Sequence, residues 1–329
     1  MKAALLYGPR SLRVEEIEEP CAPESWALVK TIAVGICGTD KAFYTGTYKL
    51  FKSPLVPGHE VVGEVVKPLS LQGKIVVPEI NFSCWQCEVC REGLYTHCPH
   101  KKTLGIDFDG GMAEYFVAPS SALHVVDLDP LSAVAVEPLA AIINALNQFP
   151  LSPNASVAVL GSGNLALLTL QLLKFIGFKP IAVVREKSRK RKYVEDLRVE
   201  VVVLEEVEDF VKKKTPSGLG FHVVFEATGS SEGLDTAIKL VRPRGLVHLK
   251  STPGLPFIVD MTTAVVKEVR VIGSRCGSYR DFEKAIELLK LRVLRPIITK
   301  IERGLDSAKD AFESAIRPEE VKVVMEVVN

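Results

Sequence analysis

Four of the seven cysteines fall within one short stretch, CWQCEVCREGLYTHC. Their spacing, C-x2-C-x2-C-x7-C, lets one segment of chain wrap a tetrahedral zinc ion, and four protein ligands leave no open position for a substrate. The spacing therefore favours a structural zinc site made by Cys84, Cys87, Cys90 and Cys98. An iron–sulfur cluster uses similar spacings and a dithiol redox pair needs only two of these thiols, so both alternatives stay open.

A second set of metal-ligating residue types is spread along the chain. Cys37 lies in GICGTD, His59 and Glu60 lie in PGHE, and Glu137 lies in VEPLA. A thiolate, an imidazole and a carboxylate can hold zinc while leaving a fourth position for water or a substrate oxygen. This set would be catalytic, but sequence spacing alone leaves open whether the residues converge.

A glycine-rich turn, VAVLGSGNLA, follows an apolar run and opens a helical one. Gly161 permits the tight turn, Gly163 lets the backbone approach a pyrophosphate, and the small Ala166 lets the helix pack on the strand. Asn164 and Leu165 begin the helix, whose N-terminus would face the phosphates. With the strand, the helix and the next strand all in place, the turn predicts a dinucleotide site.

The next strand ends in AVVREKSRKRK. An acidic residue at this point bonds the ribose 2′-hydroxyl of NAD, whereas an arginine accommodates the 2′-phosphate of NADP. Arg185 stands where the acid is expected, with Arg189 and Lys190 close behind it, so NADP is favoured over NAD. Two alternatives stay open: the charges form a solvated helix face, or Glu186 reaches the hydroxyl after a one-residue shift of register.

The elements that must position these residues change in character along the chain. Up to residue 138 short apolar runs are separated by Gly and Pro, which is typical of a β-rich domain. Strands and helices then alternate, which predicts a doubly wound parallel sheet of the α/β class. The last segment, EEVKVVMEVVN, is expected to be a strand of the first domain. We therefore expect a dinucleotide-binding domain at 139–273, inserted into a catalytic domain of residues 1–138 and 274–329 with a cysteine lobe at 81–100.

Composition limits the possible partners. The chain has 329 residues, is 47% hydrophobic and 25% charged, and carries a formal net charge of +1, so no overall basic field attracts nucleic acid or an anionic membrane. The first residues lack the apolar core of a signal peptide, and we expect a cytoplasmic protein whose thiols are free or bind metal. Small-molecule substrates are the expected partners.

The order of these motifs resembles that of the zinc-containing medium-chain alcohol and polyol dehydrogenases. GICGTD, PGHEVVGEV, the cysteine stretch, GGMAEYF, VEPLA and VLGSGNLA follow one another as in that superfamily, over nearly the whole chain. The resemblance implies a GroES-like catalytic domain and a Rossmann domain. In the branch with sorbitol, glucose and threonine dehydrogenases it maps the catalytic zinc to Cys37, His59 and Glu137, with Glu60 able to enter or leave the zinc shell, and the structural zinc to the four-cysteine lobe.

The same resemblance assigns further roles. Asp40 would orient His59, and Thr39 would carry a proton away from the substrate hydroxyl; Ala42 stands where many relatives have the histidine that completes this relay. The expected reaction is hydride transfer between a nicotinamide cofactor and a secondary alcohol, polyol or sugar, with two zinc ions per chain. The resemblance also implies cofactor contacts at Thr228, Gly229, Ser251 and Thr252, while Arg275 would contact cofactor or substrate or else form a surface salt bridge.

Two other functions compete with this interpretation. A zinc-free enone or quinone reductase of the same superfamily would lack the cysteine lobe and the Cys, His and Glu set. A dinucleotide-binding sensor without turnover would be consistent with the missing relay histidine. The segment VRVIGS resembles the strand that pairs cofactor domains in relatives, so a homodimer or homotetramer is expected.

Overall fold

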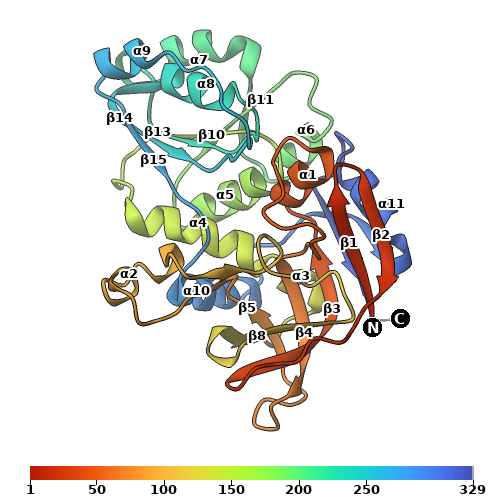
Figure 1. The fold of residues 1–329 in the computed structure, drawn as a ribbon. Helices are drawn as coiled ribbons and strands as arrows, with labels where there is room; N and C mark the ends of the chain where they lie inside the picture. The colour runs from red at the N-terminus through yellow and green to blue at the C-terminus, as the bar shows by residue number, and fades with distance from the viewer. Residues whose placement is uncertain (328–329) are drawn as a thin grey trace. The chain divides into compact units, whose positions relative to one another are not determined.

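The computed structural model describes residues 1–327, which form two compact units (Figure 1). One unit contains 1–143, 276–292 and the described part of 298–329; the other contains 144–275 and 293–297. The change-over points differ by a few residues from the expected domain bounds because the helix α4 (Val136–Gln148) runs unbroken through the first of them. The segment 293–297 joins the second unit, where the backbone N–H and C=O of Arg295 each bond the side chain of Gln171, at 2.9 and 3.0 Å.

The first unit is built on a seven-stranded sheet. Its strands are ordered β16-β17-β3-β4-β5-β9, and β8 pairs with β3. Apolar residues fill the core side of these strands, as in WALVKTIAVG of β3, because β-branched side chains pack well on a pleated surface. The elements are β1 (Lys2–Gly8), β2 (Ser11–Glu16), β3 (Trp26–Gly35), α1 (Gly38–Thr45), β4 (Glu60–Lys67), β5 (Ile75–Pro78), β6 (Asn81–Phe82), α2 (Glu88–Arg91), η1 (Tyr95–His97), β7 (Lys102–Thr103), β8 (Tyr115–Pro119), η2 (Ser120–Ala122), β9 (Leu123–Val125), α3 (Pro130–Ala133), α10 (Tyr279–Lys290), β16 (Ile298–Arg303), η5 (Leu305–Ser307), α11 (Ala308–Ala315) and β17 (Lys322–Glu326).

The second unit is a six-stranded parallel sheet in the order β12-β11-β10-β13-β14-β15. The central strand VAVL is buried throughout, as expected for a parallel sheet covered on both faces. Helices α7 and α8 lie on one face and α5 on the other (Figure 1). The elements are β10 (Val157–Leu160), α5 (Asn164–Phe175), β11 (Ile181–Val184), α6 (Arg191–Glu195), β12 (Glu200–Val203), η3 (Leu204–Glu206), α7 (Val207–Lys214), η4 (Pro216–Gly218), β13 (Phe221–Glu226), α8 (Gly233–Leu240), β14 (Val241–Leu249), α9 (Met261–Val266) and β15 (Arg270–Gly273).

The helical stretch Pro130–Gln148 is long and apolar enough to cross a membrane by length and composition. Two thirds of it, 67%, is buried within the structure. A buried core helix passes the same test of length and composition, so the stretch by itself is weak support for a membrane span.

A buried histidine joins the sheet of the first unit to α10. The Nδ1 atom of His124, on β9, lies 2.5 Å from Oε1 of Glu283, and its Nε2 lies 3.5 Å from Oε1 of Glu79. The ring stacks on Phe282 with 5.2 Å between centroids. Burial lowers the pKa of His124, but hydrogen bonding and attraction by Glu79 and Glu283 outweigh it and raise the pKa above the ordinary value. The charged form therefore contributes to the stability of this unit.

Replacing Glu283 with Gln should make stability depend differently on pH. Because the folded-state pKa of His124 is raised, its protonated form stabilises the fold fully below about pH 6.5 and loses this effect as the pH rises through the folded-state value. We expect Glu283→Gln to lower the free energy of unfolding by about 1–2 kcal/mol near pH 6 and by much less near about pH 9, measured by urea denaturation. Glu287→Gln, which breaks an exposed pair with Lys284 on the same helix, is the control. Equal losses at both pH values would contradict this role.

Candidate active site

Cys37 and His59 meet because of the register of two strands. Strands β3 and β4 pair antiparallel with Gly35 opposite Glu60. Cys37 follows the end of β3 as the N-cap residue of α1, and His59 directly precedes β4. Both residues therefore lie at the same edge of the sheet, although 21 residues separate them in the sequence.

Asp40 holds this edge together from inside. Its side chain is fully buried and accepts a hydrogen bond of 2.9 Å from the backbone N–H of Cys37 and one of 3.4 Å from that of Gly58. Its Oδ1 atom lies 3.7 Å from Nδ1 of His59, within ion-pair distance. Burial raises the pKa of Asp40, and attraction by His59 opposes that rise. The carboxylate thus fixes both the turn at Cys37 and the orientation of the His59 ring.

The residues around His59 fit a zinc ion. Burial lowers the pKa of the imidazole, but Asp40, Cys37 and Glu137 outweigh burial and raise it well above the ordinary value. The Nδ1 atom is buried without a hydrogen-bond partner among residues 1–327. Glu137 is buried on the first turn of α4. Cys37 is half-buried beside the buried His59 and Glu137, and a thiol, an imidazole and a carboxylate are a donor set that zinc accepts.

Glu60 is engaged with a lysine that the motifs do not indicate. Lys322, on β17, forms a buried ion pair with the Glu60 carboxylate and donates a hydrogen bond of 3.2 Å to the carbonyl of Ile36. A Cβ atom on Gly35 would lie 2.5 Å from Oε2 of Glu60, so only glycine leaves room for this carboxylate. The one sequence signal for Lys322 is a charged residue in an apolar strand, KVVME.

Helix α1 carries three further residues near this cluster. Thr39 is half-buried on its first turn, and the half-buried Ala42 presents only a methyl group. The pKa of Lys41 is lowered, first by burial and then by repulsion from Lys322. Sequence reasoning passed over Lys41, because nothing in GICGTDKA distinguishes it from a surface lysine.

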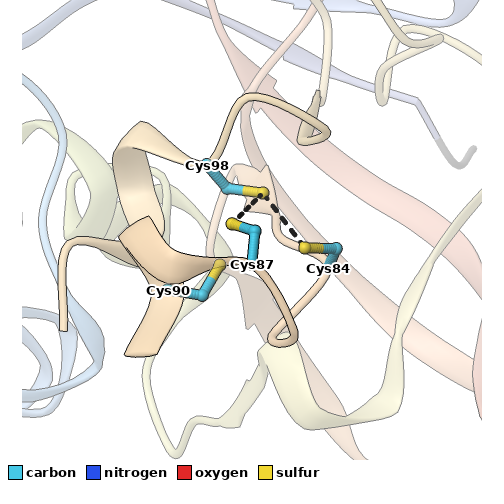
Figure 2. A group of neighbouring side chains, drawn as sticks. All are labelled: Cys84, Cys87, Cys90 and Cys98. Carbon is cyan, nitrogen blue, oxygen red and sulfur yellow. Dashed lines mark hydrogen bonds between the residues drawn. The ribbon is translucent and has the colours of Figure 1, made fainter. Parts of the chain in front are cut away.

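The four thiols of the cysteine lobe come together as the spacing predicts. Their ligand atoms all lie within 4.8 Å of one another, and within residues 1–327 this is the group of metal-ligating side chains that meets such a criterion. The Sγ atom of Cys98 is 3.8 Å from that of Cys87 and 3.5 Å from that of Cys84 (Figure 2). Sulfurs bound tetrahedrally to zinc at about 2.3 Å lie about 3.8 Å apart, so the lobe fits a zinc ion.

Backbone groups favour thiolates in part of this lobe. The N–H groups of Gln86 and Cys87 lower the pKa of Cys84 to about 6, and burial raises that of Cys90 to about 12. The N–H of His100 donates to the sulfur of Cys98 at 3.4 Å. Such donors stabilise negative sulfur, as a metal-binding loop requires.

The lobe is fastened to its unit through Tyr95. Its hydroxyl donates to Oε2 of Glu79 at 2.7 Å, its carbonyl accepts from Ser83 Oγ at 2.6 Å, and its ring stacks on Trp85 at 4.5 Å between centroids. Burial and the Glu79 carboxylate raise the pKa of Tyr95, so it stays a hydrogen-bond donor at neutral pH. The cysteines are therefore held on the same Glu79 that faces His124.

In the second unit the glycine turn forms a close approach of backbone to backbone. Gly161 has a φ of +125°, and a Cβ atom there would lie 2.7 Å from the carbonyl oxygen of Ala227. Gly163 is the N-cap of α5 and has nothing within 4 Å of the place of its missing Cβ, which leaves open space before the helix. Asn164 and Leu165 are the first two residues of α5. The turn has the shape that a pyrophosphate needs.

Hydrogen bonds connect the glycine turn and the loops at the carboxyl ends of the neighbouring strands. The hydroxyls of Ser162 and Ser188 lie 2.9 Å apart. After β13, the N–H and hydroxyl of Thr228 donate to Oε1 of the buried Glu226 at 2.9 and 2.5 Å. The N–H of Gly229 donates to Ser251 Oγ at 2.7 Å, and the exposed Thr252 follows it. The structure thus brings Thr228, Gly229 and Ser251 together beside the strand that carries the glycine turn.

The cations expected at the cofactor follow β11. Arg185 directly follows the strand, is exposed, and pairs through Nη2 with Oε2 of Glu232 at 3.2 Å. Arg189 and Lys190 lie in the same loop before α6. Arg275 is exposed at the end of the second unit, and its carbonyl accepts from Asn144 Nδ2 at 3.0 Å. Glu232 was not singled out from the sequence, because its partner stands 47 residues away.

Comparison with known proteins gives matches over both units. The alcohol dehydrogenase GroES-like domain matches residues 23–128, and the zinc-binding dehydrogenase model matches residues 165–290. The chain is 30% identical to the alcohol dehydrogenase of Geobacillus stearothermophilus over 95% of each chain, and 29% identical to the D-arabitol-phosphate dehydrogenase of Enterococcus avium over 94% of this chain and 92% of that one. A zinc-binding dehydrogenase from Sinorhizobium meliloti 1021, solved with NADP bound, has a TM-score of 0.86 and 27% identity, covering 99% of this chain and 98% of that one.

These matches confirm the expected fold class. The first unit contains the matched GroES-like segment, and the second contains most of the dehydrogenase segment, with its doubly wound parallel sheet.

Proposed function

Because the chain belongs to the zinc-binding alcohol dehydrogenase family, we propose that it is a zinc- and NAD(P)-dependent oxidoreductase that interconverts a secondary alcohol, polyol or sugar hydroxyl and the corresponding carbonyl. The observation that carries this proposal is the buried His59, whose Nδ1 lies 3.7 Å from Oδ1 of Asp40 without a hydrogen bond, with Cys37 following the neighbouring strand at the same sheet edge. A thiol, an imidazole and a carboxylate are together the kinds of donor that hold a catalytic zinc ion and leave a position open for substrate.

Two zinc ions per chain follow from the two donor sets. The four thiols of the cysteine lobe would hold one ion with no open position, and Cys37, His59 and Glu137 would hold the other. Zinc at the second set supplies Lewis-acid chemistry, which makes a substrate hydroxyl acidic and polarises a carbonyl. A nicotinamide dinucleotide on the second unit supplies the hydride acceptor or donor.

The residues of this chain would orient the zinc ligands and move the substrate proton. Asp40 holds the His59 ring and the Cys37 turn by the contacts described above. Lys322 keeps the Glu60 carboxylate from lying uncompensated beside the ligand set, because an unpaired buried charge is costly. Thr39 Oγ1 would accept the proton of the substrate hydroxyl while the hydroxyl of Thr39 releases its own proton. Because Ala42 cannot accept that released proton, water would accept it.

The proposed preference for NADP rests on the residues that would bind the adenosine end of the cofactor. Arg185 directly follows β11, and Arg189 and Lys190 follow in the same loop, and an arginine at this point favours a ribose 2′-phosphate. The Sinorhizobium meliloti relative, with 27% identity, was solved with NADP. The polyol substrate class is supported by the D-arabitol-phosphate dehydrogenase among the relatives.

Replacing the metal-ligating residues should separate turnover from cofactor binding. We expect His59→Ala and Glu137→Gln to lower kcat/KM by at least about a thousandfold, a loss of about 4 kcal/mol of transition-state stabilisation. Binding of the dinucleotide should stay within about twofold of wild type, since the glycine turn lies in the other unit. The measurement is formation of reduced nicotinamide with a panel of polyols, aldoses, amino alcohols and simple alcohols, beside calorimetric titration of the cofactor.

The panel also separates the competing functions. Turnover that survives in both variants would exclude the zinc mechanism. Cofactor binding by wild type without turnover of any alcohol or carbonyl in the panel would favour the sensor function, to which Ala42 points.

We also propose that the chain forms a homodimer or homotetramer through the second unit. Strand β15 is one of the two edge strands of its sheet, with β12 at the other edge, and an unpaired edge is a template for pairing with another copy. The segment around it exposes large apolar side chains, which are Leu255, Ile258, Met261, Val265, Val266 and Val271. Several exposed apolar residues within one short segment of chain are typical of a contact between subunits.

Charging this edge should dissociate the oligomer. We expect Val271→Lys, on β15, to reduce the mass found by light scattering after size-exclusion chromatography to that of one chain. Val125→Lys is the matched control, because Val125 is an exposed valine on β9, the edge strand of the other sheet. A wild-type protein that is already monomeric would exclude the proposed interface.

A further inference from the structure

Arg185, the cation proposed to favour NADP, is paired with a carboxylate. Oε2 of Glu232 lies 3.2 Å from Nη2 of Arg185 and accepts a hydrogen bond of 3.4 Å from Ser230 Oγ. Arg185 follows β11, and Glu232 precedes α8, so two different loops contribute the pair. The position that distinguishes the two nicotinamide cofactors in this fold therefore holds a carboxylate as well as a guanidinium.

Hydrogen bonds hold both loops in place beside the glycine turn. The loop of Arg185 is closed by the N–H of Ser188, which donates to the Arg185 carbonyl at 3.0 Å, and the Ser188 hydroxyl lies 2.9 Å from that of Ser162 in the glycine turn. The loop of Glu232 begins at Glu226, whose carboxylate holds Thr228. Gly233, next to Glu232, fits only as glycine, since a Cβ atom would lie 2.1 Å from Oε1 of Glu226.

The Arg185–Glu232 pair is exposed, so the carboxylate of Glu232 can compete with a cofactor phosphate for Arg185. The side chains of Arg185 and Glu232 are 61% and 78% exposed, so the ion pair is weak and easily opened. A 2′-phosphate that binds Arg185 must displace the carboxylate and then remain near it, with like charges repelling. A 2′-hydroxyl carries no charge and can donate a hydrogen bond to the same carboxylate.

We propose that Glu232 is a specificity-determining residue, which limits the preference for NADP by holding Arg185 and repelling the 2′-phosphate. The inference rests on the proposed dinucleotide binding. It predicts that the carboxylate weakens binding of NADP and leaves binding of NAD nearly unchanged. The residue acts on the bound ribose, so its effect is on affinity and appears without any substrate.

The experiment is calorimetric titration of the full zinc-loaded chain with NAD and with NADP at low and at high salt. We expect Glu232→Gln to tighten NADP about tenfold at low salt and to change NAD by less than about threefold. The gain should shrink at high salt, because the interaction is between exposed charges. In a background of Arg185→Gln, the same change should have a smaller effect, since the two residues act as a pair.

The matched control is Glu268→Gln, which breaks another exposed Arg–Glu pair in the same unit, with Arg244, beside the amino end of β15. It removes the same charge and should leave both affinities unchanged. An unchanged NADP affinity in Glu232→Gln, or an equal gain for both cofactors, would overturn the inference while leaving the proposed function intact. A wild-type chain that binds neither cofactor would overturn both.

Discussion

Buried charge around His59 is the constraint on which the first unit depends. Asp40, Glu60, Glu137 and Lys322 are each at most 6% exposed, and each would be costly to bury alone. Charges so placed must compensate one another, and the compensating groups come from remote segments. Lys322 reaches Glu60 across 262 positions because β17 pairs with β3 at Gly35. The return of the chain to this sheet after the second unit is thus a requirement of the site as well as of the fold.

The proposed cofactor site of the second unit is built differently. Its site consists mainly of backbone, since the glycine turn approaches Ala227 closely and leaves space beyond Gly163. Hydrogen bonds between loops, such as those of Ser162 with Ser188 and of Gly229 with Ser251, fix the surroundings of that space. The Arg185–Glu232 pair is exposed, so solvent screens its charges and the pair opens easily. In the proposed function, the first unit would hold the catalytic metal, and Arg185 and Glu232 of the second unit would set the preference between cofactors.

Much of this arrangement could be predicted from the sequence, and the remainder could not for physical reasons. Short-range patterns carry their own geometry: the cysteine spacing predicted four thiols that meet, and VAVLGSGNLA predicted a strand, a turn and a helix. Contacts between distant segments leave no such pattern. Lys322, Glu232 and the partners of His124 depend on strand register and loop packing, so they emerge only in the folded chain. The site assignments themselves stay predictions until metal and cofactor are measured.

The most direct test of the account is the zinc content of the purified chain and of two variants, measured by mass spectrometry of the metal after dialysis. Cys37→Ser removes a ligand of the proposed catalytic ion and leaves the four-cysteine lobe intact, while Cys21→Ser changes an exposed thiol outside both sets. The account predicts two zinc ions per chain in wild type and in Cys21→Ser, and one in Cys37→Ser. A wild-type chain with a single ion, or a Cys37→Ser variant that keeps two, would contradict the assignment of a catalytic metal to Cys37 and His59.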